Sequence, residues 1–224
     1  MIDQLIIGNK ASHDDYDATL KERHVGAPKK KVIKETVPFS NITYDFSKIN
    51  GELYWEERAL EYIFEIIART PQEMESKKAA FSAWVMNVMG ESIYDPYEPD
   101  WHYLGTFDDI AYDDDETSEK TTVTVTFSAY PYKIANNQTA YAFTIPANGE
   151  TMVTVLNGSS HRITPVLTTD KALTIQKSNV EYTLAAGKYE DDTFRLEPGA
   201  SILTVTNNTG SACTFQVEFY EEVF

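Results

Sequence analysis

Hydrophobic and polar residues alternate strictly in several parts of this chain, most clearly in "TTVTVTF" at residues 121–127. A period of two places the valines and the phenylalanine on one face of a strand and the threonines on the other. Residues 53–67 alternate in the same way, and residues 31–38 and the "NITYDF" stretch have the composition of short strands. Residues 102–112 and 120–130 flank an acidic turn, so we expect them to pair as a hairpin.

One segment has a helical pattern instead. Thr70 is a suitable N-cap, Pro71 suits the first helical turn and Glu73 completes a capping box. Gly90 stands where a glycine would end the helix, so the pattern predicts a helix at about residues 71–89. Apolar residues recur at helical spacing along it, which predicts a stripe that packs on a sheet: Met74, Phe81, Trp84, Val85 and Val88.

The first thirty residues are less regular. They contain one short strand pattern, "DQLIIG", and then a polar stretch that we interpret as an arm or long loop, with Gly26 and Pro28 as turn signals. The lysines at 29–31 are typical of a solvated charge run or of a contact with an acidic neighbour.

After Pro131 the composition changes. Residues 134–144 are polar and are predicted to be a linker. From residue 145 to residue 224 short strand patterns recur about every ten residues between glycine-containing turns, which is typical of an antiparallel sandwich. The sequence therefore predicts a mainly β protein: an α+β first domain over residues 1–133 with one packed helix, the linker, and a β-sandwich over residues 145–224.

Composition excludes several classes of protein. The net charge of −16, from 35 acidic and 19 basic residues, argues against binding nucleic acid through its phosphates. Cys213 is the single cysteine, so an intrachain disulfide and a zinc site built from several cysteines are excluded. No apolar run is long enough to span a membrane, and the first residues lack the basic and apolar regions of a signal peptide, which predicts synthesis in the cytoplasm.

The sequence offers no set of residues for catalysis or for a cofactor. The histidines His13, His24, His102 and His161 are scattered, and no pair of them has metal-ligand spacing. Ser159 and Ser160 precede His161 in a turn, but no third member of a triad has a recognisable context. We therefore expect a protein that is not an enzyme.

The order of these elements resembles the distal tail proteins (Dit) of long non-contractile-tailed phages. The resemblance is carried by "SAYPYK" at the end of the first domain, the early "VP" turn in "TVPFSNITYDFS", and Arg58 at the start of the strand before the helix. One departure is that Phe39, Ser40 and Asn41 replace a turn that is often rich in glycine. The last residues look like the final strands of the galectin-like or carbohydrate-module-like sandwich of that family.

The resemblance implies a structural role in the virion. Six copies would form a ring hub at the distal end of the tail tube, with the first domain in the ring and DNA passing through its hole. The expected partners are further copies of the chain, the major tail tube protein, the tail-associated lysin or tail-tip protein, and receptor-binding or baseplate proteins.

Three groups of residues are candidate sites. Unpaired edges of the strands at 31–38 and 53–67 are natural ring contacts, which makes Tyr54 and Tyr62 candidate interface residues. The acidic run could be a solvated hairpin tip, a calcium site, or a channel-facing surface that repels DNA: Asp108, Asp109, Asp113, Asp114, Asp115 and Glu116. The alternative function is host attachment through sugar binding by the sandwich, with Tyr182 and Tyr189 as stacking platforms.

Overall fold

The structure is a computed structural model that describes residues 4–36, 38–48, 51–115 and 119–224. The chain divides into two compact units: residues 1–133 together with Phe224, and residues 134–223. Antiparallel strands dominate the described residues of both units, which confirms the mainly β fold expected from the sequence. Among the described helices none is long and apolar enough to span a membrane.

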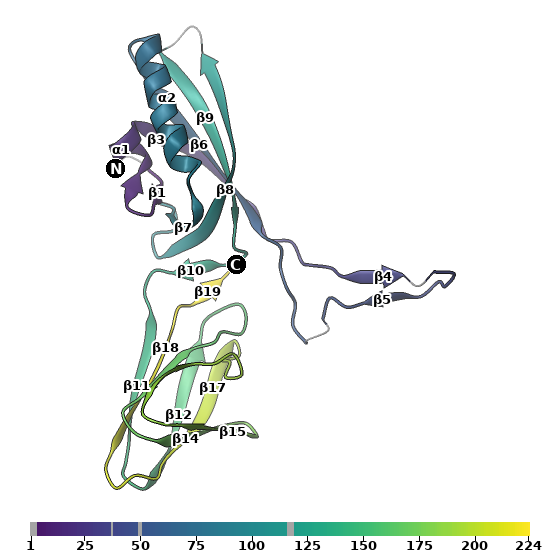
Figure 1. Cartoon of the computed structure of the whole chain (residues 1–224), viewed down its shortest axis with the longest axis vertical. Coiled ribbons are helices and arrows are strands. Elements are labelled where there is room, and N and C mark those ends of the chain that lie inside the picture. Colours follow the sequence, from purple (N-terminus) through teal and green to yellow (C-terminus); the bar gives the residue numbers. More distant parts are fainter. Residues whose placement is uncertain (1–3, 37, 49–50, 116–118) are drawn as a thin grey trace. The chain divides into compact units, whose positions relative to one another are not determined.

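The first unit is built on one antiparallel sheet, covered on one face by the helix α2 (Figure 1). Phe64 lies opposite Val123 and Leu60 opposite Phe127, and all four side chains are buried, as their alternation predicted. In the described residues the strands follow the order β2 (Lys10–Ala11), β1 (Ile6–Ile7), β7 (Met89–Tyr94), β8 (Trp101–Asp115), β9 (Lys120–Ala129), β6 (Arg58–Ile67) and β3 (Ala18–Val25). The pairing of β8 with β9 confirms the predicted hairpin.

Helix α2 spans Pro71–Val85 and is shorter than the sequence predicts. Its start is as expected, because the Thr70 side chain accepts a hydrogen bond from the Glu73 N–H. The expected end at residue 89 is wrong: the chain turns after Val85, and Val88 packs into the core from that turn. Gly90 does have a positive φ of 68°, but it lies at a bulge within β7 and does not end the helix.

The polar stretch within the first thirty residues forms regular secondary structure and is not the long loop expected from the sequence. Residues 12–16 form a short helix, α1 (Ser12–Tyr16), and β3 follows as the strand next to β6. Ala18 and Leu20 are the only buried residues of β3, and an alternation of two apolar positions is too short to predict a strand. A bulge between Leu20 and Glu22 then turns Arg23 toward the same side as Tyr62.

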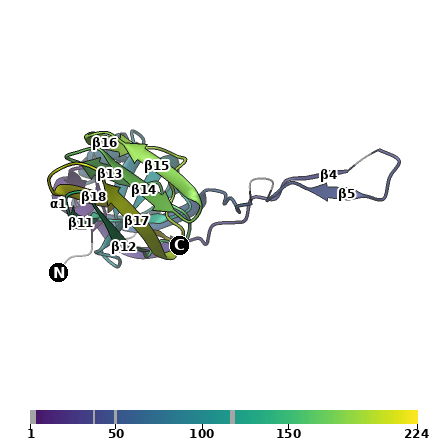
Figure 2. The same ribbon diagram turned by 90° about the horizontal axis from the view of Figure 1, so that it is seen from below.

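The strands β4 (Lys34–Thr36) and β5 (Thr43–Asp45) pair as a hairpin, drawn in Figures 1 and 2 as a separate two-stranded ribbon. In the described part of the chain these two strands pair only with each other. The strand predicted at 53–67 begins at Arg58 and lies between β9 and β3. Both of its edges are therefore occupied, so the expectation that this strand offers a free edge is wrong.

The second unit is an antiparallel sandwich, as predicted (Figure 2). In the described residues one sheet contains β11 (Thr139–Ile145), β18 (Cys213–Phe219), β13 (Val166–Thr169) and β16 (Gly187–Glu190), in that order. The other contains β12 (Gly149–Asn157), β17 (Gly199–Asn207), β14 (Leu173–Lys177) and β15 (Val180–Leu184). The prediction of a linker is wrong over residues 139–144, because these residues form most of β11. Two short strands, β10 (Lys133–Ala135) and β19 (Glu222–Val223), pair with each other.

Candidate assembly surfaces

The sheet of the first unit has a second face, on the side opposite α2. Because Val123 and Val125 point into the core under the helix, Thr122, Thr124 and Thr126 point the other way. The strand register sets these threonines between β8 and β6 in three rows, which we call the open face: Asp113, Thr122 and Glu65; Ala111, Thr124 and Ile63; Asp109, Thr126 and Glu61. These side chains are half-buried or exposed.

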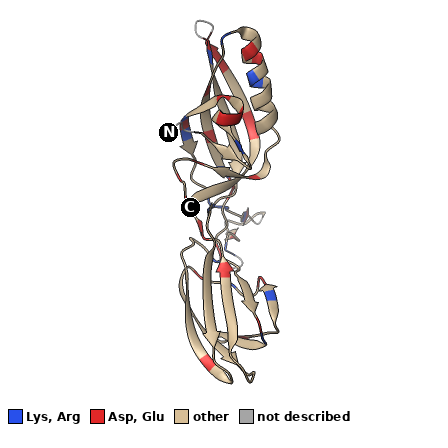
Figure 3. Ribbon diagram, turned by 90° about the vertical axis from the view of Figure 1, so that its left-hand side faces the viewer, with Lys and Arg blue, Asp and Glu red and all other residues tan. Residues whose placement is uncertain are grey.

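Carboxylates outnumber cations on and beside the open face. The Nζ atoms of Lys21 and Lys120 lie 2.9 and 3.7 Å from the Glu65 carboxylate. The hydrogen bond from Lys21 is the main reason that the pKa of Glu65 lies below its ordinary value, so this carboxylate is ionised at neutral pH. Asp109, Asp113 and Glu61 add further negative charge, and Figure 3 shows in red the acidic positions along the strands of this unit.

The acidic run is divided between the two faces of β8 and is not a single cluster. Asp109 and Asp113 lie on the open face, whereas Asp108 lies at a bulge. The Asp114 carboxylate lies 2.6 Å from Lys78 Nζ and accepts a hydrogen bond from Thr121 Oγ1, and these contacts, in that order, lower its pKa. Asp115 is exposed at the end of β8, and Glu116 lies outside the described residues. Within the described ranges no group of three acidic, histidine or cysteine side chains could hold a metal ion.

The β4–β5 hairpin and the segments leading to it expose large apolar side chains. We call residues 29–36 and 38–46 the arm; its described strand residues are all exposed. Large apolar side chains of the arm, within its strands and outside them, are at least one-third exposed: Val32, Ile33, Phe39, Ile42, Tyr44 and Phe46. Soluble proteins seldom leave so many together on one short segment, so the arm has the character of a contact surface.

Phe39 is the most unusual residue of the arm. It has a φ of 62° and a fully exposed ring. A non-glycine residue in this left-handed conformation costs about 1 kcal/mol or more, and a bulky apolar residue is rare there. Glycine would adopt this φ without strain, so the chain holds an aromatic ring at the arm tip at a conformational cost.

The two candidate interface tyrosines differ. Tyr54 is 46 % exposed. Tyr62 is fully buried under α2 and presents no surface to a second copy, so its assignment to an interface is wrong. The cause is the face of β6 on which it lies: Leu60, Tyr62 and Phe64 are on the buried face, whereas Glu61 and Ile63 are on the open face.

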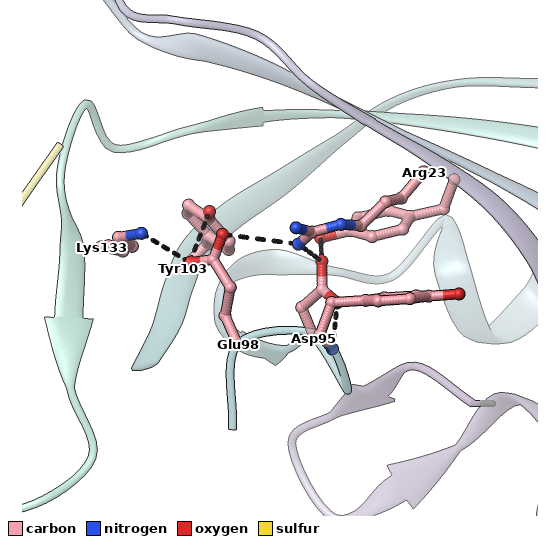
Figure 4. A network of polar contacts seen from close by, with 7 residues as sticks. Arg23, Asp95, Glu98, Tyr103 and Lys133 are labelled. Carbon is pink, nitrogen blue, oxygen red and sulfur yellow. Dashed lines mark hydrogen bonds and ion pairs between the residues drawn. The ribbon is translucent and has the colours of Figure 1, made fainter. Parts of the chain in front are cut away.

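A network of charged and polar side chains fixes the loop between β7 and β8 (Figure 4). Arg23 Nη1 donates to Asp95 Oδ2 at 2.6 Å, and the Asp95 side chain is completely buried. Tyr62 donates its hydroxyl to the same carboxylate at 3.3 Å, because burial and then the charge of Asp95 raise the pKa of Tyr62 and keep it protonated. Asp95 Oδ1 also accepts the Tyr97 N–H at 2.9 Å.

The same network continues to the end of the first unit. Glu98 lies 2.7 Å from Lys133 Nζ and 3.5 Å from Arg23 Nη1, and it accepts a hydrogen bond from the Tyr103 hydroxyl. The sequence carries one local sign of this network. Asp95 precedes Pro96 and Tyr97, the pattern of an aspartate that accepts the N–H two residues later.

Arg58 begins β6 and is buried, with 6 % of its surface exposed. Its guanidinium lies over the ring of Tyr103 at 5.6 Å, a cation–π contact. Among the described residues its Nε atom has no hydrogen-bond partner. Arg58, which the family resemblance pointed to, is thus a buried residue at the first position of β6.

The two candidate sugar platforms do not form one exposed site. Tyr182 lies on β15 and Tyr189 on β16, which belong to different sheets. Both rings are partly buried and pack against the core of the sandwich. The Tyr182 hydroxyl donates to the Thr193 carbonyl at 3.0 Å, and its ring meets Phe194 edge to face.

Comparison with known proteins adds one relevant similarity. No family model and no curated protein sequence matches the chain. Among solved structures the chain is similar to the SPP1 Dit (gp 19.1) protein, with a TM-score of 0.68 and 15 % sequence identity over 98 % of this chain and 100 % of that one. That protein is described as a paradigm of the hub adsorption apparatus in phages that infect Gram-positive bacteria. A de novo designed double-stranded β-helix aligns with 38 % of the chain at a TM-score of 0.27 and 14 % identity.

Proposed function

We propose that this chain is a distal tail protein: a structural component of a phage tail that forms a ring hub between the tail tube and the tail tip or baseplate. The observation that carries the proposal is the fold shared with the SPP1 Dit protein over nearly the whole of both chains. In this role the chain works by assembly and not by catalysis. Its partners are further copies, the major tail tube protein, the tail-tip or tail-associated lysin protein, and receptor-binding or baseplate proteins.

The arm closes the ring. A closed cyclic ring needs a heterologous contact, in which one surface of each copy meets a different surface of the next. The arm supplies one such surface, because Val32, Ile42 and Tyr44 are about half exposed and gain by burial. The strained Phe39 at its tip is consistent with a conformation held for contact.

The open face lines the channel. Its rows of threonine, aspartate and glutamate provide hydroxyls and negative charge without large apolar side chains other than Ile63. The two lysines beside Glu65 lie within ion-pair distance of that carboxylate, which reduces their capacity to bind phosphate. Negative charge in a narrow channel repels the DNA backbone, so DNA slides through it without sticking.

The test is the mass of the purified chain by light scattering over a range of concentrations, with negative-stain images of the same fractions. A mass near six times 25.4 kDa and a ring with a central hole are expected. Replacing Phe39 and Ile42 with serine in the arm should reduce the mass toward that of one chain. The matched control is Val180→Ser, which changes an apolar residue on the sandwich that is about as exposed as Ile42. A wild-type chain that stays monomeric throughout, or an arm variant that still forms the ring, contradicts the proposal.

A further inference from the structure

The outer face of one sandwich sheet carries a patch of exposed aliphatic side chains. Met152 and Leu156 on β12 are 70 % and 55 % exposed, and Ile202 on β17 is 58 % exposed. Ile202 lies opposite Thr154, between Met152 and Leu156, so the three side chains are diagonal neighbours. With their neighbours they form what we call the aliphatic face: Met152, Thr154, Leu156, Ala200, Ile202 and Thr204.

The aliphatic face lacks charge in a chain that is otherwise strongly acidic. Within the described strands of this sheet, the outward positions hold two charged side chains, Glu150 and Glu181, and both lie outside the face. Figure 3 shows how few charged residues the strands of the second unit carry. A basic partner would bind best to the acidic surfaces elsewhere on the chain. The uncharged aliphatic face suits an acidic partner instead, because it does not repel negative charge.

The free edge of this sheet is partly blocked beside the aliphatic face. β12 is an edge strand, and an unpaired edge could recruit another strand. At Leu156, however, the Tyr141 hydroxyl accepts the backbone N–H at 3.3 Å and donates to the carbonyl oxygen at 3.2 Å. The edge backbone is therefore already satisfied at this point, which leaves the aliphatic side chains as the available surface.

We propose that the aliphatic face binds the same face of a second copy of this chain, in a two-fold symmetric contact. Each copy carries a formal charge of −16, so copies repel one another, and this repulsion is weakest between surfaces that carry no charge. Two sheets packed in this way interdigitate their side chains, with Ile202 of one copy between Met152 and Leu156 of the other. This contact is independent of the arm and of ring closure.

The size of the aliphatic face predicts a weak contact. The face lies on two strands, β12 and β17, and two strands at about 4.8 Å spacing with nine residues at about 3.3 Å each give roughly 290 Å² per copy. The total of roughly 570 Å² is below the size of a stable interface, so we expect a transient contact with a dissociation constant of roughly millimolar size. Salt should strengthen the contact, because it screens the repulsion between two acidic copies.

Cysteine cross-linking in the full-length chain tests the proposal. Thr154 lies at the centre of the patch, so a short bifunctional thiol reagent, which spans the roughly 10 Å between packed sheets, should join Thr154→Cys chains into a dimer. The native Cys213 is buried and should not interfere. Thr183→Cys, an exposed position on the far strand of the same sheet, is the matched control and should cross-link at least tenfold less.

Adding Met152→Thr, Leu156→Thr and Ile202→Thr to the Thr154→Cys chain should reduce the cross-linked fraction at least tenfold while the melting temperature stays the same. The Phe39 and Ile42 arm variant should leave the cross-link intact, so failure of the ring and failure of this contact can be told apart. Absence of the Thr154→Cys dimer, equal cross-linking at Thr183→Cys, no effect of the three threonines, or weakening by salt overturns the proposal.

Discussion

Arg23 Nη1 lies 2.6 Å from Asp95 Oδ2, and the Asp95 side chain is completely buried although the two residues are 72 positions apart. This ion pair connects the edge strand β3 to the loop that follows β7. A buried carboxylate is tolerated only where it is paired and hydrogen-bonded, and here Tyr62 and the Tyr97 N–H supply the remaining bonds. The pair therefore connects two elements of the first unit that are distant in the sequence.

Asp95→Ala should lower the free energy of unfolding by about 1–3 kcal/mol, because it leaves the buried Tyr62 hydroxyl without its partner and Arg23 with only the longer contact to Glu98. Urea unfolding measures the loss. Asp100→Ala, an exposed position in the same loop, should change it by less than about 0.5 kcal/mol. Equal effects at the two positions would show that the ion pair is not important for stability.

Stability should fall in acid through Glu98. Burial opposes ionisation of this carboxyl, but Lys133 and then Arg23 outweigh it and hold its pKa below the ordinary 4.5. Since its folded-state pKa is depressed, its stabilising contribution is fully present above pH 4.5 and is lost as the pH falls through the lower, folded value. Glu98→Gln should therefore have a lower melting temperature than the wild type at pH 7, and the difference should shrink below pH 4.5. A constant difference from pH 7 to pH 3 would contradict this.

Substitutions at Tyr54 and Tyr62 should separate assembly from folding. Tyr62→Ala removes a buried ring and should destabilise the chain by about 3–5 kcal/mol. Tyr54→Asp, at an exposed position beside the base of the arm, should leave the melting temperature nearly unchanged and weaken ring formation. Thermal unfolding and light-scattering mass together distinguish the two. A Tyr54→Asp ring as stable as that of the wild type would remove Tyr54 from the interface.

Phe39→Gly should have opposite effects on the free chain and on the ring. Glycine adopts a φ of 62° without penalty, so the arm turn gains up to about 1 kcal/mol locally. Ring formation should nevertheless require a higher protein concentration than in the wild type, because the variant lacks the exposed aromatic side chain. The concentration at half assembly, from light scattering, checks this. Unchanged or easier assembly would mean that the Phe39 ring makes no contact.

Charge reversal on the open face should create DNA binding. Asp109→Lys with Asp113→Lys makes the surface assigned to the channel more positive by four units of charge per copy. The assembled variant should bind duplex DNA at 50 mM salt and release it at 200 mM, whereas the wild type should not bind. Glu150→Lys with Glu181→Lys on the sandwich makes the same change in net charge. Equal DNA binding by both variants would argue against a channel-facing role.

Local patterns account for much of the first unit. The alternation in β9 and β6 predicts both their strand character and which side chains are buried, and the Thr70 cap predicts the start of α2. Patterns failed where a distant contact decides the structure. Val88 packs into the core from the turn after α2, and β3 continues past Leu20 through a bulge to Arg23, which pairs with Asp95.

The candidate sites show the same division. The sequence identified the acidic run, but the alternation of β8 and a bulge at Asp108 assign Asp109 and Asp113 to the open face and Asp114 to Lys78. It identified two tyrosines as interface candidates. Tyr54 is exposed and remains a candidate, whereas Tyr62 is buried and cannot contact a second copy. It gave no sign of the aliphatic face, since Met152, Leu156 and Ile202 alternate with polar residues like any core-facing set.

By itself, the sequence determined the mainly β character of the chain, the start of its main helix and the absence of a second cysteine, because these depend on composition and on residues a few positions apart. The tertiary structure decided which strands have free edges, which face of each strand is buried and which charges meet. Those properties depend on strand order and register, which bring together residues as distant as Arg23 and Asp95.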